Sequence, residues 1–120
     1  GKKKILIAED EKPMAHALEL KLKNSGYEAK AVFDGFQALE ELSNTKYDLL
    51  LLDLMMPKLD GFGVLEGMKE KKIKTPVIVA TNLSQEGDIK KAKELGAKDY
   101  FVKSDTPISG VIDHVKKILG

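Results

Sequence analysis

The sequence predicts an α/β fold in which a parallel sheet is covered by helices on both faces. Strand-like and helix-like segments alternate from one end of the chain to the other. Several of the strand-like segments are uninterrupted apolar runs, which are typical of strands buried on both faces of a sheet. Strands that return through a helix form right-handed β–α–β units, and these units build open, doubly wound sheets.

The first half of the chain contains three predicted strands and two predicted helices. The strands are expected at residues 3–8, 27–33 and 47–53. Pro13 is expected to open the first helix, which ends near Gly26. Asp34 and Gln37 have the spacing of a helix cap, so the second helix should begin there. Its apolar stripe is expected to consist of Phe36, Leu39 and Leu42.

The second half continues the same alternation. Two strands are expected at residues 75–81 and 98–103, and a helix weakened by Gly63 and Gly67 around residues 62–70. Ser84 should cap a helix that reaches about Leu95, and Thr106 with Pro107 should open the last helix. Judged by their apolar runs, the first, third and fourth strands are central and the other two are edge strands. Since no linker interrupts the pattern, we expect one domain over residues 1–120.

Composition narrows the possible functions. The 120 residues are 42% hydrophobic and 32% charged, as in ordinary globular domains. The net charge of +1 gives no electrostatic case for binding nucleic acid or a membrane surface. The chain has no cysteine, which excludes disulfides, thiolate metal sites and a cysteine nucleophile. No apolar run approaches the ~18 residues of a membrane-spanning helix, so we expect a cytoplasmic protein.

Polar side chains gather where the predicted strands end. The residues at these ends are Glu9, Asp10, Asp53, Thr81, Asn82 and Lys103. Ligands of open α/β sheets bind beyond the carboxyl ends of the strands, so these side chains should share one rim. Facing water is the alternative for Asp53, which follows four leucines in LLLLDLMMPKLDG.

Charge indicates what such a rim could bind. Two carboxylates ~5 Å apart repel by about 3 kcal/mol at an effective dielectric constant near 20, so a cation must offset them. Oxygen ligands without histidine or cysteine favour Mg²⁺, and Lys103 offers a second positive charge. A carboxylate, Mg²⁺, a lysine and a hydroxyl group are the parts needed to attach a phosphoryl group to an aspartate.

The chain resembles the response-regulator receiver domains of two-component signalling, such as the chemotaxis receiver. The resemblance rests on the segments ILIAEDE, LLLLDLMMPKLDG, PVIVATN and GAKDYFVK, which follow in this order across essentially the whole chain. It implies the flavodoxin-like strand order 2-1-3-4-5, which agrees with the predicted edge strands.

The resemblance also implies the chemistry of the rim. Asp53 would accept a phosphoryl group from a sensor histidine kinase, a phosphotransfer protein or a small phosphodonor. Asp10, Asp53 and the backbone carbonyl of Met55 would bind Mg²⁺ directly, and Glu9 would act through a water molecule. Lys103 would pair with the phosphoryl oxygens.

A conformational switch is implied as well. The Thr81 hydroxyl would move to the phosphoryl group, and Tyr100 would then turn inward from a mostly solvent-facing position. The surface formed by the fourth helix, the fifth strand and the fifth helix would report this change to an output domain or protein. The helix at residues 84–95 has few large apolar residues, which suits a segment that shifts.

Two residues depart from the family pattern. The family usually has a proline after its lysine, in a cis peptide, but Ser104 follows Lys103 here. If the Lys103–Ser104 bond is trans, we expect the Lys103 amine to lie farther from Asp53. Asn82 stands where the family usually has a small residue, and it could slow an attacking water or hydrogen-bond the loop.

Three classes of function remain open. The first is a phosphorylation switch that catalyses only its own phosphorylation and dephosphorylation. The second is a haloacid-dehalogenase-type phosphohydrolase, which needs an acid two residues after the nucleophile, where this chain has Met55. The third is a degenerate receiver that only binds proteins. For His16 and His114 we expect surface positions, and for residues 69–75 a solvated loop or, less favoured, a docking patch.

Overall fold

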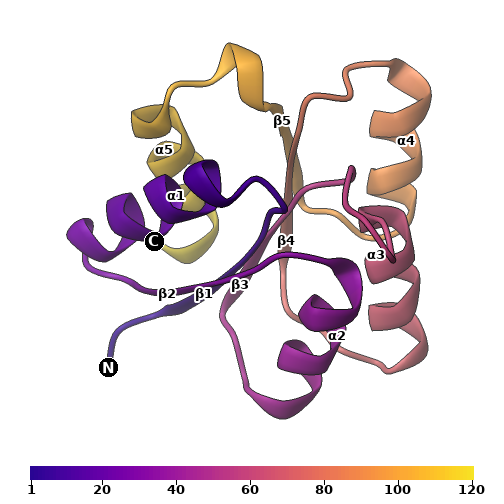
Figure 1. The fold of residues 1–120 in the computed structure, drawn as a ribbon, viewed down its shortest axis with the longest axis horizontal. Coiled ribbons are helices and arrows are strands. Elements are labelled where there is room, and N and C mark those ends of the chain that lie inside the picture. The colour runs from indigo at the N-terminus through magenta and orange to yellow at the C-terminus, as the bar shows by residue number, and fades with distance from the viewer.

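The computed structural model describes all 120 residues and has five parallel strands between two layers of helices (Figure 1). The strands are β1 (Lys4–Ala8), β2 (Glu28–Val32), β3 (Leu49–Leu52), β4 (Val77–Thr81) and β5 (Asp99–Val102). The helices are α1 (Lys12–Asn24), α2 (Gly35–Asn44), α3 (Gly61–Glu70), α4 (Glu86–Glu94) and α5 (Ile108–Leu119). A short 3-10 turn, η1 (Lys103–Asp105), joins β5 to α5.

The strand order is β2-β1-β3-β4-β5, so the predicted topology and both predicted edge strands are confirmed. All four neighbouring pairs are parallel. Helices α1 and α5 cover one face of the sheet, and α2, α3 and α4 cover the other (Figure 1). The carboxyl ends of the strands therefore open at one edge, between the two helical layers.

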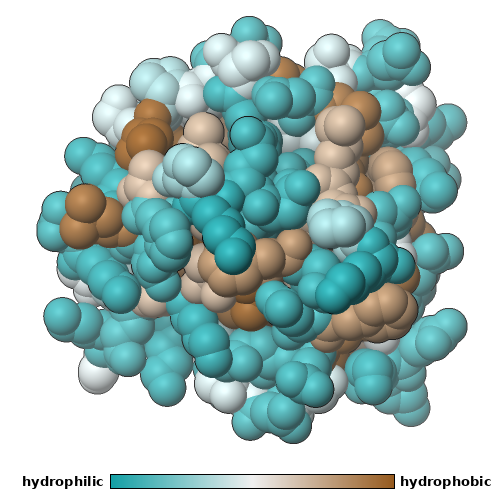
Figure 2. All heavy atoms as spheres, in the orientation of Figure 1, coloured by the Kyte–Doolittle hydropathy of each residue, from teal (hydrophilic) through white to brown (hydrophobic).

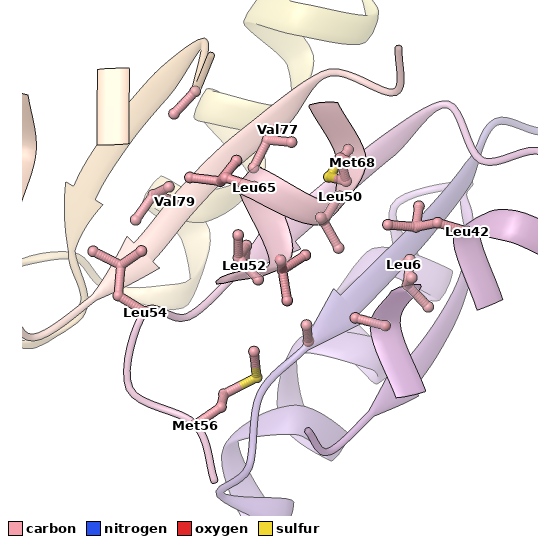
Figure 3. Close-up of a cluster of buried hydrophobic side chains, with 14 of the residues drawn as sticks. Leu6, Leu42, Leu50, Leu52, Leu54, Met56, Leu65, Met68, Val77 and Val79 are labelled. Carbon is pink, nitrogen blue, oxygen red and sulfur yellow. The ribbon is translucent and has the colours of Figure 1, made fainter. Parts of the chain in front are cut away.

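The side chains of the central strands alternate between two hydrophobic cores. Leu50 and Leu52 of β3 belong to the core under α2, α3 and α4, which Figure 3 shows in part. Leu49 and Leu51 belong to the core under α1 and α5. Because each residue is at most 1% exposed, burial of each side chain contributes about 2 kcal/mol of transfer free energy. The leucine run before Asp53 therefore fixes this strand between both layers.

The outer surface is mostly hydrophilic, with smaller apolar patches on the face that Figure 2 shows. None of the helices has both the length and the apolar character needed to cross a membrane. Phe36 is 58% exposed, so its predicted place on the buried stripe of α2 is wrong. The helix buries Ala38 and Leu42, and Phe36 lies about 200° around the helix axis from Ala38.

Two predicted helix starts have different outcomes. The Asp34 side chain caps α2 by accepting a hydrogen bond from the Gln37 N–H at 2.9 Å, as predicted. Ser84 does not cap α4, because that helix begins at Glu86 after Gln85, without any side-chain cap. Acidic residues in the first turn of α4 instead complement the helix dipole.

Two glycines of α3 allow close approach of the backbone. A Cβ at Gly61 would lie 2.5 Å from the Asp53 carbonyl oxygen and 2.6 Å from the Leu54 Cα. The Gly61 N–H also donates to the Leu54 carbonyl at 3.0 Å, which closes the loop after Asp53 on itself. A Cβ at Gly67 would lie 2.6 Å from the Leu39 side chain, so this glycine lets α3 pack on α2.

His114 joins α5 to the edge strand β5. Its Nδ1 lies 2.6 Å from the Asp99 carboxylate, and its ring stacks on Phe101 at 4.8 Å. The expectation of a surface position is therefore wrong for His114, which is half-buried, whereas His16 is exposed as expected. Burial favours a higher pKa of Asp99, but hydrogen bonds from His114 and the Tyr100 N–H, with nearby positive charge, bring it below its usual value.

The Asp99 carboxylate should stabilise the fold at neutral pH. A carboxylate with a lowered folded pKa contributes stability above its unfolded pKa of about 3.9, and this is lost as the pH falls through the folded pKa. Asp99→Asn should therefore lower the free energy of unfolding by about 1 kcal/mol at pH 7 and have a diminishing effect below about pH 4. Urea unfolding at several pH values measures this. The exposed Asp113→Asn is the control, and an equal effect of both changes would contradict the prediction.

Candidate functional site

Three acidic residues from two segments meet at the carboxyl edge of the sheet. Glu9 and Asp10 follow β1, and Asp53 follows β3 directly. Glu9 is 2% exposed and Asp53 is 5% exposed, whereas Asp10 faces solvent. One carboxylate oxygen from each of the three lies within 4.8 Å of the others. The structure thus brings together the acidic residues that the sequence placed on one rim.

Lys103 bridges the two buried carboxylates. Its Nζ lies 2.5 Å from Glu9 Oε1 and 2.9 Å from Asp53 Oδ2, and its side chain is 8% exposed. The Lys103–Ser104 peptide is trans, since the chain has no cis peptide bond. The expectation that a trans bond would place the amine farther from Asp53 is therefore wrong. The η1 turn begins at Lys103 and lets the side chain reach the acids from a trans backbone.

Burial and charge act in opposite directions in this site. Burial raises the pKa of Glu9 and outweighs the hydrogen bonds from Lys103 and the Glu11 N–H, which lower it, while the charge of Asp53 adds to the rise. Burial alone would lower the pKa of Lys103, but its bonds to Glu9 and Asp53 outweigh burial and raise it. The amine therefore stays charged at neutral pH and offsets part of the repulsion between the two acids.

The remaining oxygens of the buried acids also have donors. Asp53 Oδ1 accepts from the Met55 N–H, and Glu9 Oε2 accepts from the Glu11 N–H, each at 3.1 Å. No buried side-chain polar atom in the chain lacks a hydrogen-bond partner. Met55 is 55% exposed, whereas Met56 belongs to the hydrophobic core under α2, α3 and α4.

An open cleft lies in front of these groups. Its lining residues are Asp10, Glu11, Asp53, Met55, Asn82 and Lys103. Three carboxylates against one ammonium group leave the Glu9, Asp10 and Asp53 cluster with a charge of −2, and the cluster offers only oxygen ligands. This donor set fits a hard divalent cation such as Mg²⁺. Sequence reasoning missed Glu11, whose carboxylate lies 3.9 Å from the Lys103 amine.

The two predicted switch residues lie on β4 and β5. Thr81 is fully buried, and its hydroxyl oxygen accepts a long hydrogen bond of 3.4 Å from the Leu83 N–H. The Tyr100 hydroxyl donates to the Leu83 carbonyl at 2.7 Å, and its half-buried ring packs against the core. The expectation of a mostly solvent-facing Tyr100 is therefore wrong. Both residues contact the same loop between β4 and α4, and Ala92 is the only buried residue of α4.

These features define a class of protein. The sheet order, the acidic cluster beyond β1 and β3, and the lysine beyond β5 coincide with a match of residues 5–110 to the model of the response regulator receiver domain. The chain belongs to this family. Receiver domains bind Mg²⁺ at an acidic site, and response regulators interact through them with histidine kinases and output domains.

Two curated relatives of this chain are transcriptional regulatory proteins. The transcriptional regulatory protein DltR of Streptococcus agalactiae is 41% identical over 83% of this chain and 45% of its own length. The alkaline phosphatase synthesis transcriptional regulatory protein PhoP of Bacillus subtilis is 38% identical over 88% of this chain and 44% of its own length. These relatives are transcriptional regulators rather than metabolic enzymes, and this chain spans less than half of their length.

Solved structures show the same fold. The receiver domain of a Francisella response regulator has a TM-score of 0.90 and 31% identity, with coverage of 97% of this chain and 95% of its own. The receiver domain of a sensor histidine kinase from Pseudomonas aeruginosa has a TM-score of 0.89 and 25% identity, with coverage of 100% of this chain and 99% of its own. That protein holds a magnesium ion in its active-site cleft.

Removing the bridging lysine should cost more stability than removing one of its acids. Lys103→Met leaves two buried carboxylates without their cation and should lower the free energy of unfolding by about 3 kcal/mol or more. Asp53→Asn should lower the free energy of unfolding by less, because Lys103 remains bonded to Glu9 and the repulsion between the Glu9 and Asp53 carboxylates is removed. The measurement is urea unfolding in EDTA. Lys58→Met is the control, because that lysine is 69% exposed in its pair with Asp34. A larger loss for Asp53→Asn would contradict this account of the site.

Proposed function

We propose that residues 1–120 form one receiver domain that works in the cytoplasm as a phosphorylation switch, with Asp53 as the acceptor. The observation that carries this proposal is the geometry of Asp53. Its carboxylate is buried beside a charged lysine and two further acids, yet it lines an open cleft. A carboxylate in this position can attack a phosphorus atom while Lys103 stabilises the charge that develops on the phosphoryl oxygens.

The transfer step uses an oxygen of Asp53 as the nucleophile. A new P–O bond forms between this oxygen and the donor phosphorus, and the bond from phosphorus to the donor's leaving group breaks. With a phosphohistidine of a sensor histidine kinase or phosphotransfer protein, the P–N bond breaks and the imidazole leaves with the electron pair. With an acyl phosphate, a carboxylate leaves. The domain thus acts on itself and converts no external metabolite.

Glu9, Asp10, Asp53 and the Met55 carbonyl are the groups that would hold Mg²⁺. The cation would supply charge neutralisation for the phosphoryl group. The Met55 N–H already fixes one oxygen of Asp53, and the Glu11 N–H fixes one oxygen of Glu9. These backbone bonds keep both carboxylates oriented toward the cleft edge before any donor arrives.

The two alternative functions find less support. A phosphohydrolase of the haloacid-dehalogenase type would need an acid where Met55 stands. A degenerate receiver would not need the complete set of Asp10, Asp53, Thr81 and Lys103, and the position of these four residues at the carboxyl ends of the strands supports the switch instead. The domain is expected to pass its signal to an output domain or partner protein rather than to nucleic acid or membrane directly.

Asp53 should become phosphorylated in the presence of a small phosphodonor. Incubation with acetyl phosphate and Mg²⁺ should add one phosphoryl group, which intact mass measurement detects and peptide mapping assigns to Asp53. Asp53→Asn should abolish the reaction, because the amide oxygen is a poor nucleophile. Chelation by EDTA or Asp10→Ala should slow it by about tenfold or more.

Asp48→Asn offers a matched control for this experiment, because Asp48 lies before β3, at the opposite end of that strand from Asp53, and bonds to the Lys4 N–H. This variant should react at the wild-type rate. A wild-type protein that gains no phosphoryl group, or gains it on another residue, would overturn the proposed function.

The same proposal assigns the conformational switch to Thr81 and Tyr100. The hydrogen bond from the Leu83 N–H to the Thr81 hydroxyl is long and therefore weak. The hydroxyl can break it and donate to a phosphoryl oxygen instead. Leu83 also accepts the Tyr100 hydroxyl, so movement at Thr81 changes the anchor of the Tyr100 ring. Burial first, and then the charges of Asp88 and Asp53, raise the pKa of Tyr100.

A beryllofluoride mimic of the phosphoryl group should change the NMR signals of the Tyr100 ring. In Thr81→Ala the change should be smaller, because the hydroxyl that couples Asp53 to the loop is absent. Tyr27 and Tyr47 are both buried away from this loop and serve as internal controls in the same spectra. Equal responses of Tyr100 in the two proteins would refute the coupling.

A further inference from the structure

A hydrogen bond joins the loops that follow β4 and β5. The Ser104 N–H donates to the side-chain oxygen of Asn82 over 3.0 Å. Backbone pairing of the two strands ends with Thr81 opposite Val102, so this bond continues their connection beyond the last pair. Asn82 and Ser104 are also the two residues at which the sequence departs from the family pattern, so the structure joins both departures by one hydrogen bond.

We propose that Asn82 is a positioning residue, which holds the Lys103 loop through this bond in the conformation required for phosphoryl transfer to Asp53. We call the hydrogen bond the Asn82–Ser104 latch. The inference rests on the phosphorylation proposed above. It assigns to Asn82 the role of orienting the Lys103 side chain toward Asp53.

The latch acts on the residues directly after the two groups expected to contact the phosphoryl group. Asn82 follows Thr81, and Ser104 follows Lys103. The Lys103 side chain is a flexible four-carbon stem, so the position of its ammonium group is well defined only if its backbone is fixed. The β5 ladder fixes the backbone up to Val102, and the latch fixes the next peptide beyond Lys103. Lys103 is thus held from both sides.

Only a backbone N–H at position 104 can complete the latch. A proline there has no N–H and would leave the Asn82 oxygen without this donor. Asn82 and Ser104 are exposed, so water can replace part of a lost bond. Loss of the latch should therefore slow phosphorylation only by about two- to tenfold, the range that one net hydrogen bond of this kind supports.

Asn82 also lines the cleft beside Asp53, so truncating it has two possible effects. It breaks the latch, and it opens space in front of the acceptor. Ser104→Pro separates these effects, because it breaks the latch and leaves the Asn82 side chain in place. Ser104→Ala is the matched control, since it removes the hydroxyl group and keeps the N–H.

The test compares Asn82→Ala, Ser104→Pro, the double variant and Ser104→Ala. The rate of Asp53 phosphorylation by acetyl phosphate with Mg²⁺ should fall about two- to tenfold in both latch-breaking single variants and stay at the wild-type value in Ser104→Ala. The double variant should be no slower than either single variant, because both remove the same bond. Amide hydrogen exchange at position 104, followed by NMR, should be slow in wild type and Ser104→Ala and faster in Asn82→Ala.

Two results would overturn the latch. In the first, Asn82→Ala loses the exchange protection at Ser104 and keeps the wild-type phosphorylation rate, so the bond exists without positioning Lys103. In the second, the effects of Asn82→Ala and Ser104→Pro multiply in the double variant, so the residues act separately. A wild-type protein without any phosphoryl group on Asp53 would instead overturn the proposed function, and the exchange measurement would still report the bond.

Discussion

Two buried carboxylates, Glu9 and Asp53, lie at the same edge of this sheet, where their repulsion would oppose folding. The ammonium group of Lys103 bonds to both and compensates part of that repulsion. The strand order imposes a further requirement, because Lys103 follows β5 and must reach past the end of β4 to the acids beyond β1 and β3. The arrangement around Asp53 therefore depends on the whole sheet rather than on any one loop.

The two cores keep this edge in place. Residues of β1, β3 and β4 are buried on both faces, so the strand ends cannot shift without disturbing packing on one side or the other. The edge strand β5 is less buried, and its position relies more on polar contacts, among them the pair of Asp99 with His114. The rigid part of the molecule thus carries the acids, and the less buried part carries Lys103 and Tyr100.

The sequence predicted the elements and the acidic rim well because both follow from local patterns. Apolar runs identify buried strands, and residues that follow parallel strands must lie at one edge. Contacts between distant residues left no such pattern. His114 contacts Asp99 across 15 residues of sequence, and Lys103 lies in a trans loop at the start of η1, which bonds to Asn82 through Ser104. Phe36 was misplaced because a helix stripe can be drawn through apolar residues that do not share one face.

Two loops lie beside Asp53, one between β3 and α3 and one between β4 and α4, and they are held in different ways. The first is in close contact with Gly61. At Gly61, where α3 begins, the backbone after Asp53 leaves no room for one added carbon atom, so the end of the loop between β3 and α3 is tightly packed. The loop between β4 and α4 is held to β5 and η1 by hydrogen bonds that involve side chains, and each such bond has a small net free energy. Under the proposed phosphorylation of Asp53, a displacement that starts there should therefore move the loop between β4 and α4 rather than the loop between β3 and α3.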